Sequence, residues 1–132
     1  MNMDVHMIDK YYEEHSVYRS LVVCDSDESA EELTETLVSK DYSVVMVSGD
    51  DIDSERGEYM EKISQYREER MLVISHYTLH KLYPLIQAHV LPHQNLIIFY
   101  NIDYNLLRLT TMKCLLESQV LGFLEDVNIL SM

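Results

Sequence analysis

Two pairs of histidines have a spacing that could support metal binding. His76 and His80 lie four positions apart, and so do His89 and His93. On a helix this spacing places two imidazoles on one face, where they could hold zinc. However, Pro92 would break the helix of the second pair, and no pair of cysteines accompanies either one. We therefore interpret these residues as unrelated surface histidines and predict neither a metal site nor a bound cofactor.

Two carboxylates, Asp25 and Asp27, directly follow a short apolar run and could form an acidic pair. Such a pair resembles the one in response-regulator receiver domains. A receiver also needs an aspartate that can be phosphorylated at the end of its third strand and a lysine at the end of its fifth. Ser75 or His76 stands at the first of these places, and no lysine ends the last expected strand. We interpret Asp25 and Asp27 as helix-capping residues.

The cysteines Cys24 and Cys114 are the only two in the chain. Two reduced core thiols are the simplest interpretation, although the sequence leaves a disulfide open. A thiol could also pair with a histidine as nucleophile and base. No spacing in the chain supports such a pair, so no catalytic residue is predicted among these side chains.

The charge of the chain is strongly acidic and unevenly distributed. The net charge is −13, and residues 1–70 hold 19 of the 23 acids but 7 of the 10 Lys and Arg residues, which gives this half −12. Phosphate backbones are repelled by such a surface, so we expect no tight autonomous nucleic-acid binding. The acidic face is either solvated or a docking surface for a basic partner. No apolar run approaches the roughly 18 residues that span a bilayer.

Short apolar runs alternate with amphipathic segments along the chain. The runs predict strands over 19–24, 42–47, 71–75 and 95–100, with a further one at 119–124. The amphipathic segments predict helices over 3–15, 28–40, 54–66, 77–90 and 104–117. The residues expected to face the core are Ala30, Leu33, Leu37, Val38, Met60, Ile63, Leu79, Leu82, Leu85 and Ile86. This alternation predicts a three-layer, doubly wound α/β sandwich with a mostly parallel sheet.

The strand ends carry a pattern that resembles a known family. Gly49 and Asp50 follow one predicted strand, and Arg56 follows at the spacing of "HGD…Q..R" in the second RecA-like domain of DEAD-box RNA helicases. Ser48 stands for the histidine of that motif and Asp53 for its glutamine. The segments 22–26 and 30–33 resemble the opening strand and "AEEL" helix of this domain, while 70–75 and 95–101 resemble two later strands. The resemblance implies a RecA-like fold over 17–132, preceded by a helical extension over 1–16.

The same alignment lacks the residues that handle ATP and RNA in that family. After Arg70 and Ser75, where "TD…RG.D" is expected, the aspartate, arginine, glycine and final aspartate are replaced by His76, His80, Lys81 and Tyr83. The arginine-rich "HRxGRxGR" is absent, since the only basic residues within 102–116 are Arg108 and Lys113. Such arginines stabilise charge on a transferring phosphate, and the chain has no phosphate-binding GxxxxGK[ST] loop either. We expect no ATPase or helicase activity.

An excess of apolar side chains in the later helices predicts either a protein interface or a deeper core. The candidates are Tyr77, Tyr83, Tyr104, Leu106, Leu107, Leu109 and Met112, followed by Leu115 and Leu116. The first hypothesis is a catalytically inactive interaction module that self-associates as a homodimer. It resembles the helicase-C modules of Yb-type Tudor-domain proteins of the piRNA pathway. That resemblance implies a role in RNA silencing and a cytoplasmic location in ribonucleoprotein granules.

Two alternatives stay open. The chain could be the second lobe of a divergent RNA helicase that needs a separate ATP-binding lobe. It would then use Arg56, Arg70 or Arg108 in place of the missing arginines. The less acidic second half could also bind RNA by itself, which the scarcity of Lys and Arg disfavours.

Overall fold

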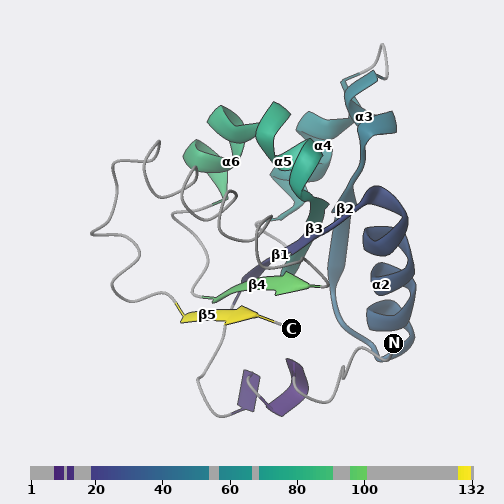
Figure 1. Ribbon diagram of the computed structural model, residues 1–132, viewed down its shortest axis with the longest axis vertical. Coiled ribbons are helices and arrows are strands. Elements are labelled where there is room, and N and C mark those ends of the chain that lie inside the picture. The colour runs from purple at the N-terminus through teal and green to yellow at the C-terminus, as the bar shows by residue number, and fades with distance from the viewer. Residues whose placement is uncertain are drawn as a thin grey trace.

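The fold is a parallel β-sheet with helices on both faces (Figure 1). The computed structural model describes residues 8–10, 12–13, 19–53, 57–66, 69–90, 96–100 and 128–131. The strands are β1 (Ser20–Cys24), β2 (Val44–Val47), β3 (Met71–Ser75), β4 (Leu96–Tyr100) and β5 (Asn128–Ser131). They form one five-stranded sheet in the order β2-β3-β1-β4-β5, and every neighbouring pair is parallel.

The helices lie in the connections between the strands, because successive parallel strands must be joined by crossovers. They are α2 (Asp27–Ser39), α3 (Gly49–Asp53), α4 (Glu58–Gln65), α5 (His76–Lys81) and α6 (Tyr83–His89). Helix α2 covers one face of the sheet, whereas α4, α5 and α6 lie on the other (Figure 1). The prediction of a doubly wound, three-layer α/β sandwich is therefore confirmed.

The strand order also decides between the two folds that the acidic pair left open. A receiver domain has the order 2-1-3-4-5, with its first strand between the second and third. Here β1 lies between β3 and β4, because Val22 pairs with Val73 on one side and with Ile98 on the other. The receiver interpretation is excluded by this topology.

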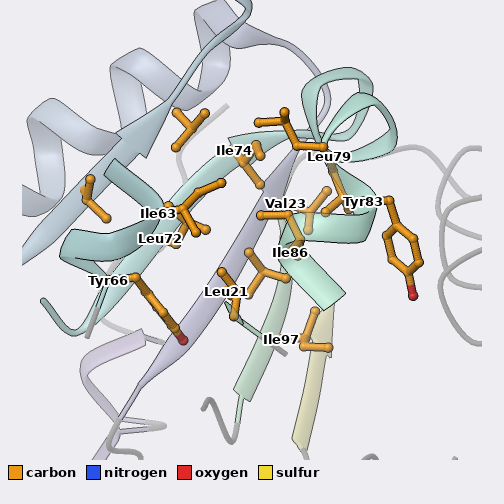
Figure 2. Packing of buried hydrophobic residues seen from close by; sticks show 14 residues of the cluster. Leu21, Val23, Ile63, Tyr66, Leu72, Ile74, Leu79, Tyr83, Ile86 and Ile97 are labelled. Atoms are coloured by element: carbon orange, nitrogen blue, oxygen red, sulfur yellow. The ribbon is translucent and has the colours of Figure 1, made fainter. Parts of the chain in front are cut away.

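Alternate residues of β1, β2 and β3 pack into two separate cores. All five residues of β1 and of β3 are buried, as expected for central strands of a sheet covered on both faces. Figure 2 shows the core beneath α4, α5 and α6, which contains Leu21, Val23, Ile63, Leu72, Ile74, Leu79, Ile86 and Ile97. The core beneath α2 contains Val22, Cys24, Ala30, Leu33, Leu37, Met71, Val73 and Ile98.

The N-terminal segment contributes to the core beneath α2. Residues 8–10 and 12–13 are helical, in agreement with the helix predicted over 3–15. Ile8 is fully buried in this core. The hydroxyl of Tyr12 is hydrogen-bonded to that of Ser20, and the hydroxyl of Tyr42 donates to Asp9. The described part of the extension is thus packed onto the domain.

The helix predicted over 77–90 is divided at Leu82 into α5 and α6. Pro84 lies in the first turn of α6, where its missing N–H is tolerated, but inside one long helix it would remove a backbone hydrogen bond. Tyr83, the first residue of α6, is 6% exposed and lies at the margin of the core in Figure 2. The prediction that Tyr83 lies on an exposed interface is therefore wrong.

Two predicted core residues are exposed instead. Val38 in α2 is 53% exposed and Met60 in α4 is 44% exposed, because each lies beside the buried stripe of its helix. The predicted helix 104–117, with Tyr104, Leu106, Leu107, Leu109 and Met112, falls outside the described residues. So does the strand predicted over 119–124; the last described strand is β5.

Candidate functional site at the carboxyl edge of the sheet

The carboxyl ends of β1, β2 and β3 meet at one edge of the sheet, which is where doubly wound folds bind ligands. The residues that follow these strands are polar: 25–27 after β1, 48–50 after β2, and Ser75 at the end of β3. Ser26 is the N-cap of α2, and its side chain accepts a hydrogen bond of 3.1 Å from Ser29 N–H. The cap lies within the segment 25–27, but the capping residue is Ser26, so the prediction that Asp25 and Asp27 cap this helix is wrong.

The carboxylate of Asp27 joins three strand ends to one another. Its Oδ2 accepts a hydrogen bond from Gly49 N–H at 3.0 Å, just beyond β2. Its Oδ1 accepts one from the Thr78 hydroxyl at 3.2 Å. Thr78 is fully buried and bonded in turn to Ser75 at the end of β3, with 3.0 Å between the two hydroxyl oxygens. Asp27 itself begins α2 just after β1, so one side chain connects β1, β2 and β3.

Glycine at position 49 allows the carboxylate to come this close. A Cβ atom at this position would lie 3.1 Å from Asp27 Oδ2, which is tighter than most Cβ contacts. The glycine of the helicase-like motif therefore leaves room here for a side chain of the same protein.

A second carboxylate, Asp51 in α3, is bonded within the same edge. Its Oδ2 accepts a hydrogen bond of 2.7 Å from Ser48 N–H, and its Oδ1 lies 2.9 Å from Lys62 Nζ in α4. Burial favours a higher pKa for this carboxyl group, but the hydrogen bonds from Ser48 and the charge of Lys62 outweigh it and lower the pKa below 3.8. Asp51 is therefore ionised at neutral pH, and the ammonium group of Lys62 is engaged by it.

The retained motif residues are only partly brought together. Gly49, Asp50 and Ser75 lie at the carboxyl edge. Arg70 lies at the opposite edge, since it precedes β3 and its backbone N–H and C=O pair with Ser43 and Ser20. The five residues of β3 separate the two edges by about 16 Å, which exceeds the reach of an arginine side chain. Arg56 falls outside the described residues.

The other candidate side chains do not assemble into a reactive or metal-binding site. The rings of His76 and His80 lie edge to face with centroids 6.2 Å apart. Within the described part of the chain, no three His, Cys, Asp or Glu residues are grouped as metal ligands. Cys24 is fully buried, and burial together with the charge of Asp25 raises its thiol pKa to about 12. Such a thiol stays protonated at neutral pH and is a poor nucleophile.

Tyr77 is the predicted interface residue that the structure describes as exposed. Its side chain is 59% exposed on α5, and Lys81 Nζ lies 4.6 Å from the centre of its ring. That distance is typical of a cation–π contact. Its exposure fits the predicted surface, while the remaining interface candidates beyond Tyr83 lie outside the described residues.

The hydrogen bond between Thr78 and Ser75 and the one from Ser48 N–H to Asp51 were not predicted from the sequence, although each has a local sequence signal. Ser75 and Thr78, like Ser48 and Asp51, are polar residues three positions apart at the start of a helix, which is the spacing of a capping contact. The bond from Thr78 to Asp27 has no such signal, because 51 positions separate the two residues.

Comparison with known proteins gives the fold. No protein-family model matches the chain, and no curated protein matches it. A solved structure described as the C-terminal part of the Fun30 ATPase domain is similar to it, with a TM-score of 0.65 and 13% sequence identity. The match covers 96% of this chain and 38% of that one, so this chain spans less than half of its neighbour. The chain has a RecA-like α/β fold.

That likeness concerns the fold alone, since the two sequences share few residues. It supports the RecA-like fold that the sequence resemblance implies and does not distinguish the DEAD-box group from other groups. None of the described helices is both long enough and apolar enough to cross a bilayer.

Proposed function

We propose that this chain is a catalytically inactive helicase-like domain that acts as a protein-interaction module. The observation that carries the proposal is the carboxylate of Asp27, which accepts hydrogen bonds from Gly49 N–H and the Thr78 hydroxyl. These two donors stand at strand ends where such folds receive ligands. An acidic side chain of the same protein therefore uses groups that an incoming phosphate would need.

The charges at this edge oppose a phosphate as well. A phosphate that approached within about 4 Å of the Asp27 carboxylate would meet a repulsion of about 4 kcal/mol at an effective dielectric constant near 20. Asp25, Asp50 and Asp53 add negative charge at neighbouring strand ends. Lys62, a cation near this edge, is held by Asp51. Electrostatics and hydrogen bonding thus both disfavour nucleotide or RNA binding here.

Self-association is the interaction that the sequence predicts. The exposed ring of Tyr77 and the apolar residues expected over 104–112 motivate a homodimer. A place in an RNA-silencing or ribonucleoprotein-granule protein of the cytoplasm is the narrower form of this proposal. Sedimentation at several concentrations tests the homodimer, and a strict monomer at high micromolar concentration would count against it.

The alternative, a second lobe of a divergent helicase, draws support from the retained Gly49 and Asp50 at the end of β2. It is weakened by the position of Arg70, which lies at the edge of the sheet opposite this site. In that alternative the arginine role falls to Arg56 or Arg108.

Nucleotide and RNA titrations separate the two functions. The purified chain would be mixed with labelled single-stranded RNA at low salt, with and without ATP, and anisotropy and phosphate release would be recorded. We expect neither RNA binding in the micromolar range nor ATP turnover, whether the chain is alone or joined to a lobe that carries a phosphate-binding loop. Turnover at a helicase-like rate in either form would overturn the proposal.

A further inference from the structure

Strand β2 is an edge strand: it lies at one side of the sheet, as the first in the strand order. It pairs with β3, and among the described strands no other lies beside it. Its sequence, Val-Val-Met-Val, contains neither a charged residue nor a proline, which are the usual protections of an edge. With these protections missing, the shortness of the strand is what limits pairing with another chain.

The backbone groups that face away from the sheet can be assigned from one hydrogen bond. Met71 N–H donates to Ser43 C=O at 3.0 Å, so the backbone groups of Ser43 face β3. Because successive residues of a strand alternate, Val44 and Met46 direct their N–H and C=O groups outward. The next outward donor, Ser48 N–H, is bonded to Asp51 Oδ2 at 2.7 Å. The open edge therefore extends over Val44–Met46 and ends at Ser48.

The surroundings of this edge are strongly negative. Residues 27–66 contain 12 acids and 3 Lys or Arg residues, which gives a net charge of −9. Helices α2 and α4 pack against β2 from opposite faces of the sheet (Figure 1). Both helices expose carboxylates to solvent, namely Glu28, Glu31 and Glu35 in α2 and Glu58 and Glu61 in α4. A strand added beside β2 would lie between two acidic helices.

We propose that the open edge of β2 binds an extended, basic peptide segment of a partner protein, which adds a sixth strand to the sheet. Backbone hydrogen bonds to Val44 and Met46 hold the peptide, and its Lys or Arg side chains face the acids of α2 and α4. This inference deepens the proposed interaction role and rests on it.

A second copy of this chain fits the same edge less well. Pairing of two β2 strands would bring together two segments 27–66 that each carry a net charge of −9. Like charges that face each other across strands are destabilising. The complementary charge of a basic peptide removes this cost.

The test uses a fluorescein-labelled peptide of about eight residues that alternates lysine and valine, long enough to cover β2. A peptide that alternates glutamate and valine serves as its control. Binding is measured by anisotropy at low and at physiological salt, with the whole chain. We expect the lysine peptide to bind, to bind more weakly as salt rises, and to bind at least about tenfold more tightly than the glutamate peptide.

Two variants of one residue separate strand addition from general attraction to an acidic surface. Met46→Pro removes an outward N–H without breaking the pairing with β3, a position where edge strands tolerate proline. Met46→Val keeps that N–H and is the matched control. We expect Met46→Pro to weaken binding at least about tenfold and Met46→Val to change it by less than about twofold. Amide exchange of Met46 in the wild-type chain should slow when the peptide is present, which provides a readout independent of any variant.

Several outcomes overturn the inference. They are no binding of the lysine peptide, equal binding of the two peptides, and unchanged binding by a folded Met46→Pro variant. Self-association that Met46→Pro abolishes would assign the edge to a second copy instead. ATP turnover by the chain would overturn the proposed function while leaving the peptide result intact, so the two failures can be told apart.

Discussion

Replacement of Asp27 by alanine should destabilise the domain strongly, although Asp27 is only half-buried. The variant loses two hydrogen bonds to a charged acceptor, one from Gly49 N–H at 3.0 Å and one from the Thr78 hydroxyl at 3.2 Å. Each bond of this kind contributes about 1.5 kcal/mol or more, so we expect a loss of about 3 kcal/mol in the free energy of unfolding. For a domain of this size, that corresponds to a fall in Tm of about 10 °C.

The matched control is Glu28→Ala. Glu28 shares the first turn of α2 with Asp27 and has a similar effect on the helix dipole, but it is exposed. Urea unfolding followed by circular dichroism should show a loss below about 1 kcal/mol for this control. Asp27→Asn keeps one acceptor oxygen and should fall between the two. If Asp27→Ala and Glu28→Ala unfold at the same urea concentration, the carboxylate does not hold the strand ends together and the reasoning is refuted.

Anion binding offers an independent readout of the same side chain. Without the Asp27 carboxylate, Gly49 N–H and the Thr78 hydroxyl become available to a small anion. Sulfate should therefore raise the Tm of Asp27→Ala more than it raises the Tm of Glu28→Ala, whose response measures the general stabilising effect of this salt. Equal shifts for the two variants would show that these donors do not form an anion site.

Three further outcomes are expected. The pKa of Asp51 is lowered in the folded state, so its contribution to stability is present above pH 3.8 and is lost as the pH falls through the lower folded pKa. Urea titrations between about pH 5 and pH 2 should therefore show that acid lowers the free energy of unfolding less for Asp51→Asn than for the wild type. Tyr83→Ala should lower the free energy of unfolding by about 3 kcal/mol and Tyr77→Ala by less than about 1 kcal/mol, because the first residue is 6% exposed and the second 59%. Thermal unfolding of the two variants tests this, and a larger loss for Tyr77→Ala would contradict the assignment of Tyr83 to the core. Cys24 should resist iodoacetamide at pH 8 in a Cys114→Ser background until the protein unfolds, since its thiol is fully buried with a pKa of about 12; mass spectrometry of the native protein would reveal any early modification.

Strands β1 to β4 were predictable because their sequences are short and mostly apolar, whereas β5 at Asn128–Ser131 was not predicted. The run 71–75 was predicted with the bounds that β3 has. A parallel strand buried on both faces needs no polar partner residue, so its sequence alone marks it. The parallel, doubly wound sheet was predicted from the alternation of strands and helices, but no strand order was, and the position of β1 between β3 and β4 needed the structure.

Side-chain exposure was less predictable where a helix departs from one straight axis. The apolar residues over 77–90 were counted on a single helical wheel, whereas α5 and α6 are separate helices that meet at Leu82. Tyr83 was therefore counted among the surplus apolar residues proposed as an interface, although it is buried. Val38 and Met60 were misplaced for a different reason, because an apolar residue at the border of the buried stripe can lie on either side of it.

The contact between Asp27 and Thr78 links the carboxyl ends of the strands to the proposed peptide-binding site on β2. A strand that accepts a new partner must already be held in an extended, twisted form, because the ordering of both strands at once costs more free energy. Strand β2 is short and lies at the border of the sheet, so its carboxyl end has few neighbours of its own. The bond from Gly49 N–H to Asp27 ties that end to α2, and the bond from Thr78 to Asp27 ties α2 to α5, which begins directly after β3. The carboxylate that we propose disfavours phosphate binding thus also fixes the end of the strand to which a basic peptide would add. Asp27→Ala should therefore weaken peptide binding even where the variant remains folded.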